Sequence, residues 1–213
     1  MRSTLPRMLA AVLTLAPTAA LAHTGAAYVQ GLYAHGLYAH GLSAHGFADG
    51  FAHPFGGLDH ILAMVTVGIL AWQLGGRAIW VVPASFVSLM AIGGALGITG
   101  EPLPWVELGI AASVIVLGTM VALGVRAPLA MLMAIVGLFA IFHGYAHGCE
   151  MPLDASGSTY AAGFVLATAL LHVAGIALGF LIGRIGNAYG RLAYQMGGGS
   201  VALVGVGILA HVI

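Results

Sequence analysis

Histidine is the most frequent ionisable residue in this chain, with ten copies against six Lys plus Arg and six Asp plus Glu. His143 and His147 stand four positions apart, so on a helix their imidazoles share one face and both can bind one metal ion. His53 and the adjacent pair Asp59 and His60 add two imidazoles and a carboxylate. These residue types and spacings indicate a divalent transition-metal site. Two other interpretations stay open: independent interfacial histidines, and Asp59 as an N-terminal helix cap.

Several other side chains are secondary candidates for the same site. Glu107 lies in an apolar run near Trp105, where it either joins the metal ligands or only reaches the lipid head groups. His172 lies in the middle of another apolar run, either as a deeper relay site or hydrogen-bonded to Thr168. For Cys149 and Met64 we expect an ordinary exposed thiol and apolar packing, and for His211 no role.

A five-residue repeat precedes the first histidine group. Residues 31–45 contain three copies of Gly-Leu-Tyr/Ser-Ala-His, which end at His35, His40 and His45, and the pattern decays toward His53. Glycine in every copy disfavours a stable helix, and a five-residue period does not keep the imidazoles on one helix face. One hypothesis is a flexible tether that, with His23, captures scarce metal for His53. The alternatives are a neutral repeat expansion and an interfacial segment.

The elements that position these residues must lie in lipid. The chain is 61% apolar and 6% charged, whereas soluble domains carry roughly 25% charged residues. A formal net charge of zero excludes the basic surface that nucleic-acid binding requires. We predict an all-α polytopic membrane protein with the lipid bilayer as its partner. Its six transmembrane helices are expected at residues 58–74, 78–98, 105–125, 129–147, 160–182 and 192–212.

The N-terminal residues and the charges predict the topology. Residues 1–22 have the basic start, short apolar run and small-residue end of a cleavable signal peptide. Residues 23–52 then form a His/Gly-rich exported segment, and residues 53–213 form the six-helix transmembrane domain. In this arrangement all four arginines that follow residue 22 lie in cytoplasmic connections, as the positive-inside rule requires. Glycines at positions 175, 179 and 183 indicate close helix packing.

The two histidine groups also carry a family resemblance. Residues 53–60 read H-x5-D-H and residues 142–150 read FHGYAHGxE, and together they resemble the HupE/UreJ family of bacterial membrane proteins. The resemblance implies uptake of nickel, with cobalt as the alternative, for hydrogenase or urease maturation across the bacterial inner membrane. It also implies a transported ion rather than a tightly bound cofactor. The metal ligands implied by the resemblance are His53, Asp59, His60, His143, His147 and Glu150.

The leading hypothesis is therefore a permease for a divalent transition metal and not an enzyme. Ligand chemistry alone leaves nickel, cobalt, zinc and copper(II) open, so nickel rests on the resemblance. Because protonated imidazole cannot bind metal, we expect capture to fail below about pH 6 to 6.5. The alternatives are a membrane-bound metal store or sensor without transport and a haem-binding electron carrier. A homo-oligomer is compatible with the sequence.

Overall fold

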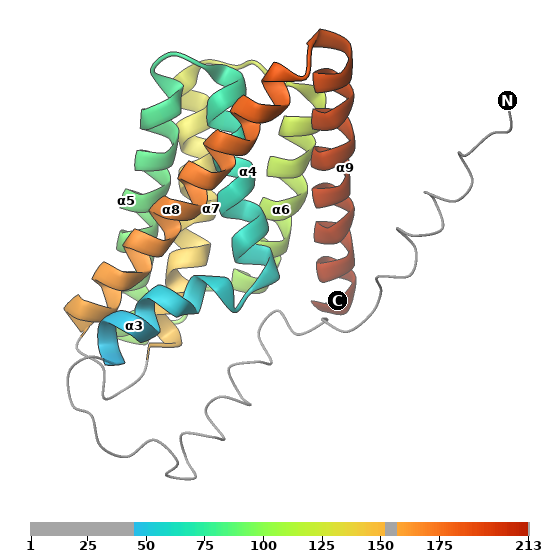
Figure 1. The fold of residues 1–213 in the computed structure, drawn as a ribbon. Helices are drawn as coiled ribbons and strands as arrows, with labels where there is room; N and C mark the ends of the chain where they lie inside the picture. Colours follow the sequence, from blue (N-terminus) through green and yellow to red (C-terminus); the bar gives the residue numbers. More distant parts are fainter. Residues whose placement is uncertain (1–44, 152–156, 213) are drawn as a thin grey trace, which may run out of the picture.

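The computed structural model describes residues 45–151 and 157–212, and all regular structure within these ranges is helical. A short helix and a 3₁₀ turn lead into six long helices that stand side by side (Figure 1). The elements are α3 (His45–Ala52), η1 (His53–Phe55), α4 (Leu58–Leu74), α5 (Ala78–Thr99), α6 (Val106–Leu123), α7 (Leu129–Cys149), α8 (Gly157–Arg184) and α9 (Asn187–Val212). The predicted signal peptide, His23, His35 and His40 lie outside the described residues.

Each apolar run that the sequence predicts as a span coincides with one of the six long helices. The breaks between helices also follow the sequence, because glycines stand where the backbone turns. Gly100 and Gly124 adopt left-handed conformations directly after α5 and α6, a conformation that ends helices and that only glycine adopts at little cost. Helix ends and connections were therefore predictable from local chemistry.

Five of these helices, α5 to α9, are long and apolar enough to cross a membrane. The exception is α4, which has 17 residues. It is long enough to cross a membrane only when it is counted together with α3 and η1, from which it is bent by 80°. Its side chains are the most deeply enclosed: Ala63, Met64, Val67 and Leu70 have no exposed surface. Large apolar side chains on the other helices, such as Trp80 and Leu203, face outward. The protein is thus a multi-helix membrane protein built around α4.

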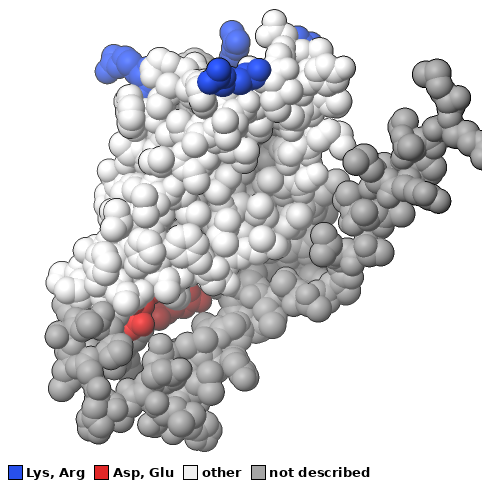
Figure 2. Space-filling model, in the orientation of Figure 1, with Lys and Arg blue, Asp and Glu red and all other residues white. Residues whose placement is uncertain are grey.

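Charged side chains divide between the two ends of the bundle (Figure 2). Arg77, Arg126, Arg184 and Arg191 lie beside the α4–α5, α6–α7 and α8–α9 connections, at what we call the arginine end. The acidic residues of the described chain lie at the opposite, acidic end, where α4, α6 and α8 begin: Asp49, Asp59, Glu101, Glu107 and Glu150. The two ends thus carry opposite charge.

Helix α3 is not among the elements predicted from the sequence. It crosses the acidic end of the bundle and packs on the first turns of α8 (Figure 1). Close contact is possible because Gly50 lies against the backbone of Tyr160, and Gly163 lies against the backbone of Phe47 and Phe51. From Gly46 onward the repeat shortens from five residues to four, which keeps the glycines on one helix face. This change of period was the missed signal, and it places η1 and His53 beside α8.

Candidate metal centre

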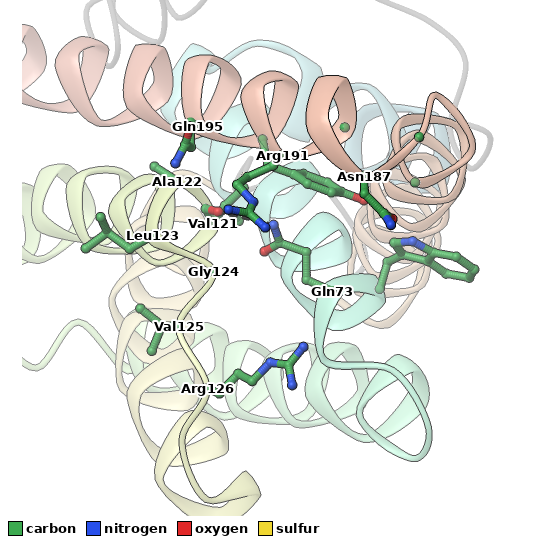
Figure 3. Close-up of a pocket in the computed structure, with 15 residues that line it drawn as sticks. Gln73, Val121, Ala122, Leu123, Gly124, Val125, Arg126, Asn187, Arg191 and Gln195 are labelled. Carbon is green, nitrogen blue, oxygen red and sulfur yellow. Dashed lines mark hydrogen bonds between the residues drawn. The ribbon is translucent and has the colours of Figure 1, made fainter.

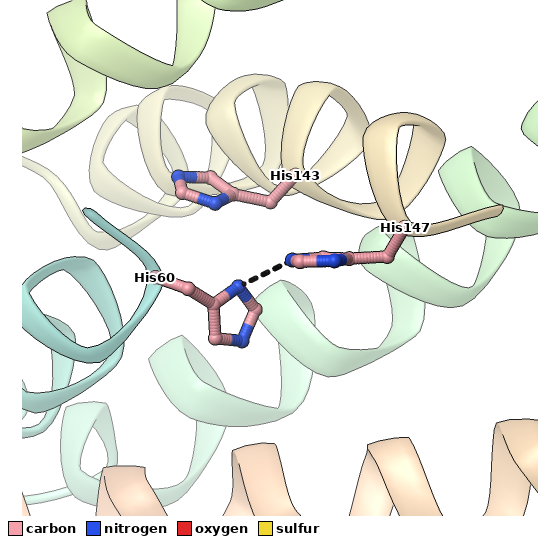
Figure 4. A group of neighbouring side chains, drawn as sticks. All are labelled: His60, His143 and His147. Atoms are coloured by element: carbon pink, nitrogen blue, oxygen red, sulfur yellow. Dashed lines mark hydrogen bonds between the residues drawn. The ribbon is translucent and has the colours of Figure 1, made fainter. Parts of the chain in front are cut away.

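Three histidines from two helices meet inside the acidic end of the bundle. His60 comes from the first turn of α4, and His143 and His147 come from successive turns of α7 (Figure 4). One nitrogen of each ring lies within 4.8 Å of the others, which is close enough for a single metal ion to be shared. His60 and His143 are 1% exposed and His147 is 7% exposed. Three imidazoles are therefore gathered where water is largely excluded.

The rings of His60 and His147 meet edge to face, with one nitrogen of each ring in contact. His60 Nδ1 lies 2.9 Å from His147 Nε2, and the ring planes are nearly perpendicular, at 81°. Two nitrogens that bind one ion at about 2.0–2.1 Å lie about 2.9 Å apart when they subtend a right angle at it. His60 Nε2 is buried and has no hydrogen-bond partner among residues 45–151 and 157–212. The pair is thus spaced for two adjacent positions of one coordination sphere.

Ser113 on α6 orients the third imidazole. Its hydroxyl donates to the carbonyl of Ile110 at 2.6 Å, so its oxygen accepts the second contact, from His143 Nε2 at 2.8 Å. His143 then carries its proton on Nε2, which leaves the lone pair on Nδ1. A hydroxyl or carboxylate that holds one ring nitrogen in this way is the usual support of a metal-binding histidine. Ser113 therefore selects the nitrogen with which His143 can bind a metal.

A second group overlaps the first at His147. Glu150, at the end of α7, accepts a hydrogen bond from His53 Nε2 at 3.0 Å, and its Oε2 lies 3.5 Å from His147 Nδ1. His53, His147 and Glu150 also meet the spacing needed to share one ion, and they are more accessible than the first group. The side chains of His53 and Glu150 are 26% and 22% exposed. The two groups form a continuous path from the surface of the acidic end into the bundle.

Aromatic side chains line this path. Phe164 of α8 contacts the rings of His53, His60 and His147, with the closest centroid separation at 4.8 Å. Tyr160, one turn earlier, stacks on Phe164 and meets the edge of His53. Apolar walls of this kind lower the local dielectric constant and strengthen the interaction of a cation with its ligands.

Two carboxylates predicted for the site are not members of either group. Asp59 is 2% exposed, and its Oδ1 accepts the backbone N–H of His60 at 2.8 Å within the first turn of α4, whereas Gly57 and not Asp59 holds the N-cap position. Glu107 lies exposed on the first turn of α6. That Asp59 and Glu107 are metal ligands therefore stays a proposal.

The remaining candidates lie elsewhere. The thiol of Cys149 approaches the carbonyl of Gly97 at 3.6 Å, and Met64 is packed in the core, so neither belongs to the groups. His172 lies deeper on α8, and its predicted partner Thr168 donates instead to the sulfur of Met90 at 3.9 Å. His45 begins α3 and His211 lies near the end of α9; their side chains are not described.

Sequence reasoning missed Ser113 and Phe164. Ser113 carried a usable signal, since it is one of only three side chains in α6, with Glu107 and Thr119, that hold hydrogen-bonding groups. Such a hydroxyl in an apolar span needs a partner, and a histidine on a facing helix supplies one. Phe164 carried no signal, because nothing local distinguishes it from a lipid-facing phenylalanine.

A cavity of about 670 Å³ lies at the arginine end, away from the two histidine groups (Figure 3). Arg126, from the α6–α7 connection, and Arg191, from α9, line it together with the polar side chains of Gln73, Asn187 and Gln195. Gln73 donates to the carbonyl of Val121 at 3.1 Å, which ties the end of α4 to α6. Basic and amide groups predominate among its polar side chains, so this cavity is no cation site.

Comparisons with known proteins agree with the two motifs. The family profile described as HupE / UreJ protein matches residues 10–208. The chain is 50% identical over 160 residues to Protein HupE of Rhizobium leguminosarum bv. viciae, an alignment that covers 75% of this chain and 82% of that protein. No solved structure matches. The profile match over nearly the whole chain and this relative show that the chain belongs to the HupE/UreJ family.

Proposed function

We propose that this protein is a permease that takes up a divalent transition metal, with nickel as the first candidate and cobalt as the second. The observation that carries the proposal is the buried group His60, His143 and His147, which joins the more accessible group His53, His147 and Glu150. The first accessible ligands receive the ion, and the buried imidazoles replace part of its hydration shell. The ion is cargo and no tightly bound cofactor is needed.

The choice of metal rests on two supports of different strength. Imidazole and carboxylate suit nickel, cobalt, zinc and copper(II), and affinity alone does not separate these ions in favour of nickel. The two motifs and the family favour nickel, and with it a supply role for hydrogenase or urease maturation. Asp59, next to His60 in the chain, and Glu107, on the first turn of α6, complete the proposed ligand set.

The proposed orientation places the acidic end in the periplasm. The arginine end then faces the cytoplasm of a bacterial cell, in agreement with the positive-inside rule. This orientation follows from a cleaved signal peptide at residues 1–22 and six spans, with α4 counted as a full span. Since the acidic side chains lie at the same end as the two histidine groups and the arginines lie at the opposite end, the charge distribution favours the approach of a cation to the acidic end.

The test is accumulation of radioactive nickel in cells that carry the wild type or the double variant His143→Ala, His147→Ala. Each residue supplies one nitrogen to the buried group, so accumulation should fall by about tenfold or more, in line with the loss of ligand support at metal sites. The matched control is His211→Ala, which removes an imidazole from α9. Immunoblots of membrane fractions measure the amount of each variant, and accumulation is compared per amount of protein.

Equal accumulation by the wild type and the double variant would reject the permease. Nickel binding by the purified protein without accumulation in cells would favour a membrane store or sensor instead. An optical spectrum with haem absorption bands would favour the electron carrier. For a permease that relies on neutral imidazole, accumulation should also weaken as the pH falls, because protons and metal compete for the same nitrogens.

A further inference from the structure

His172 is an imidazole enclosed in the middle of the bundle without a hydrogen-bond partner. It is 2% exposed, and neither ring nitrogen has a partner in the described structure. It lies 15 residues into α8, which is about 22 Å along the helix axis at 1.5 Å per residue. A buried polar group left without a partner costs about 1–3 kcal/mol. An apolar side chain at this position would avoid that cost. The imidazole is therefore explained best by a ligand that binds to it transiently.

Two further side chains with donor atoms lie near this level of the bundle. Thr168 precedes His172 by one helical turn and is fully buried, and its hydroxyl donates to the sulfur of Met90 on α5 at 3.9 Å. Met90 itself is 1% exposed, and Phe86, one turn before it on α5, contacts the His172 ring. An imidazole, a thioether and a hydroxyl therefore lie on adjoining turns of α5 and α8 in the interior.

The deep imidazole is linked to the entrance groups through one aromatic ring. The ring of Phe86 contacts both His143, at 6.0 Å between centroids, and His172, at 5.3 Å, so it separates the two levels. Met90 and His147 also line one apolar cavity of about 160 Å³, which neither His172 nor Thr168 lines.

We propose that His172, with Met90 and Thr168, forms a second, weaker metal-binding site at which the ion stops on its way through the membrane. The proposal rests on the permease function above and assigns its mid-membrane step. A neutral thioether and a neutral hydroxyl are weak ligands for nickel(II) or cobalt(II) compared with imidazole and carboxylate, so the ion binds loosely and leaves readily. Conduction requires an entrance site that binds the ion well enough to admit it, followed by weaker sites from which the ion can leave.

The test compares His172→Leu, which removes the donor nitrogen, with His172→Cys, which replaces it by a thiolate donor. Purified protein is titrated with nickel, and cells that carry each variant are assayed for nickel accumulation. For His172→Leu we expect entrance-site affinity within about twofold of wild type and accumulation lower by about tenfold. For His172→Cys we expect accumulation to recover to at least half, with stronger inhibition by cadmium, because cadmium prefers soft sulfur ligands.

Leu171→Ala is the matched control, since it opens space beside His172 without removing a donor. Wild-type accumulation by His172→Leu would overturn the proposal. Equal loss in His172→Leu and His172→Cys would overturn it as well, because the cysteine supplies a donor and only packing would then explain the defect. Failure of the permease itself has a different signature, in which the double variant His143→Ala, His147→Ala accumulates nickel like the wild type.

Discussion

At the scale of single residues, the metal centre depends on groups that orient its imidazoles as well as on the imidazoles themselves. Ser113 holds the proton of His143 on Nε2, and Glu150 lies against both His53 and His147. A partner that engages one ring nitrogen leaves the other nitrogen available for metal, and such support commonly changes metal affinity by about 10–100-fold. Ser113, which is not a proposed ligand, is therefore the first residue to test.

Replacing Ser113 by alanine should lower nickel affinity by about tenfold, since His143 Nε2 loses its acceptor and the ring is free to change tautomer or rotate. Titration of the purified protein with nickel measures the effect. Thr119→Val is the control on the same helix, because the Thr119 hydroxyl only bonds to the Ile115 carbonyl on an exposed face. Unchanged affinity in Ser113→Ala would show that His143 does not depend on this hydrogen bond.

At the scale of helices, the bundle consists of three closely packed pairs. In each pair glycines bring two backbones together: Gly93 and Gly144 join α5 and α7, Gly68 and Gly175 join α4 and α8, and Gly118 and Gly198 join α6 and α9. Gly175 confirms the prediction made from the glycine spacing, whereas Gly183 has no close backbone neighbour. The buried histidine group takes His60 from the α4–α8 pair, His143 and His147 from the α5–α7 pair, and its supporting Ser113 from the α6–α9 pair. The site lies where the three pairs meet.

The pairing predicts a strong effect of Gly144→Ala. A methyl group at this position would meet the carbonyl of Met90 and force α5 and α7 apart. We expect a lower melting temperature in detergent and loss of nickel binding, because His143 and His147 flank this glycine. Thermal unfolding followed by circular dichroism checks the first effect.

Gly199→Ala is the control for that substitution. Position 199 on α9 has open space where the methyl group would lie, and alanine is a better helix former than glycine by about 1 kcal/mol. This variant should melt at or above the wild-type temperature. If both variants melt alike, the glycine contacts between α5 and α7 do not hold the pair together.

The sequence allowed the long helices and the histidines that meet inside the bundle to be predicted, because both depend on local signals. Apolar runs end at glycine and proline, and the H-x5-D-H and FHGYAHGxE motifs place His60, His143 and His147 at one membrane depth. The partners of the helices were not predictable, because the choice depends on contacts between distant glycines. Ser113, Phe164 and the packing of α3 follow from that choice and were missed for the same reason.

At the scale of the whole molecule, opposite charge at the two ends implies an orientation that one native residue can report. Cys149 is the only cysteine of the chain, and it is exposed at the acidic end. A membrane-impermeant maleimide added to intact spheroplasts should label it if that end is periplasmic. Mass spectrometry of the purified protein measures the extent of labelling.

The reciprocal variant is Arg126→Cys in a Cys149→Ala background, which moves the thiol to the arginine end. It should be labelled only after the membrane is opened. Two results together would reverse the proposed orientation: labelling of the Arg126→Cys variant in intact spheroplasts, and no labelling of Cys149 in the wild type under the same conditions. The two histidine groups would then lie at the cytoplasmic side, where the ion leaves.

At the proposed site one ion would bind side chains from different helix pairs, and metal binding would then resist the separation of those pairs. An ion held by side chains from different pairs also holds those pairs together, so the free energy of binding adds to the free energy of assembly, by about 2.7 kcal/mol at a ligand concentration one hundred times Kd. The same gain opposes any separation of the pairs that would let the ion move on. Affinity and turnover therefore work against one another in this architecture, and a variant that binds nickel more tightly should carry it more slowly.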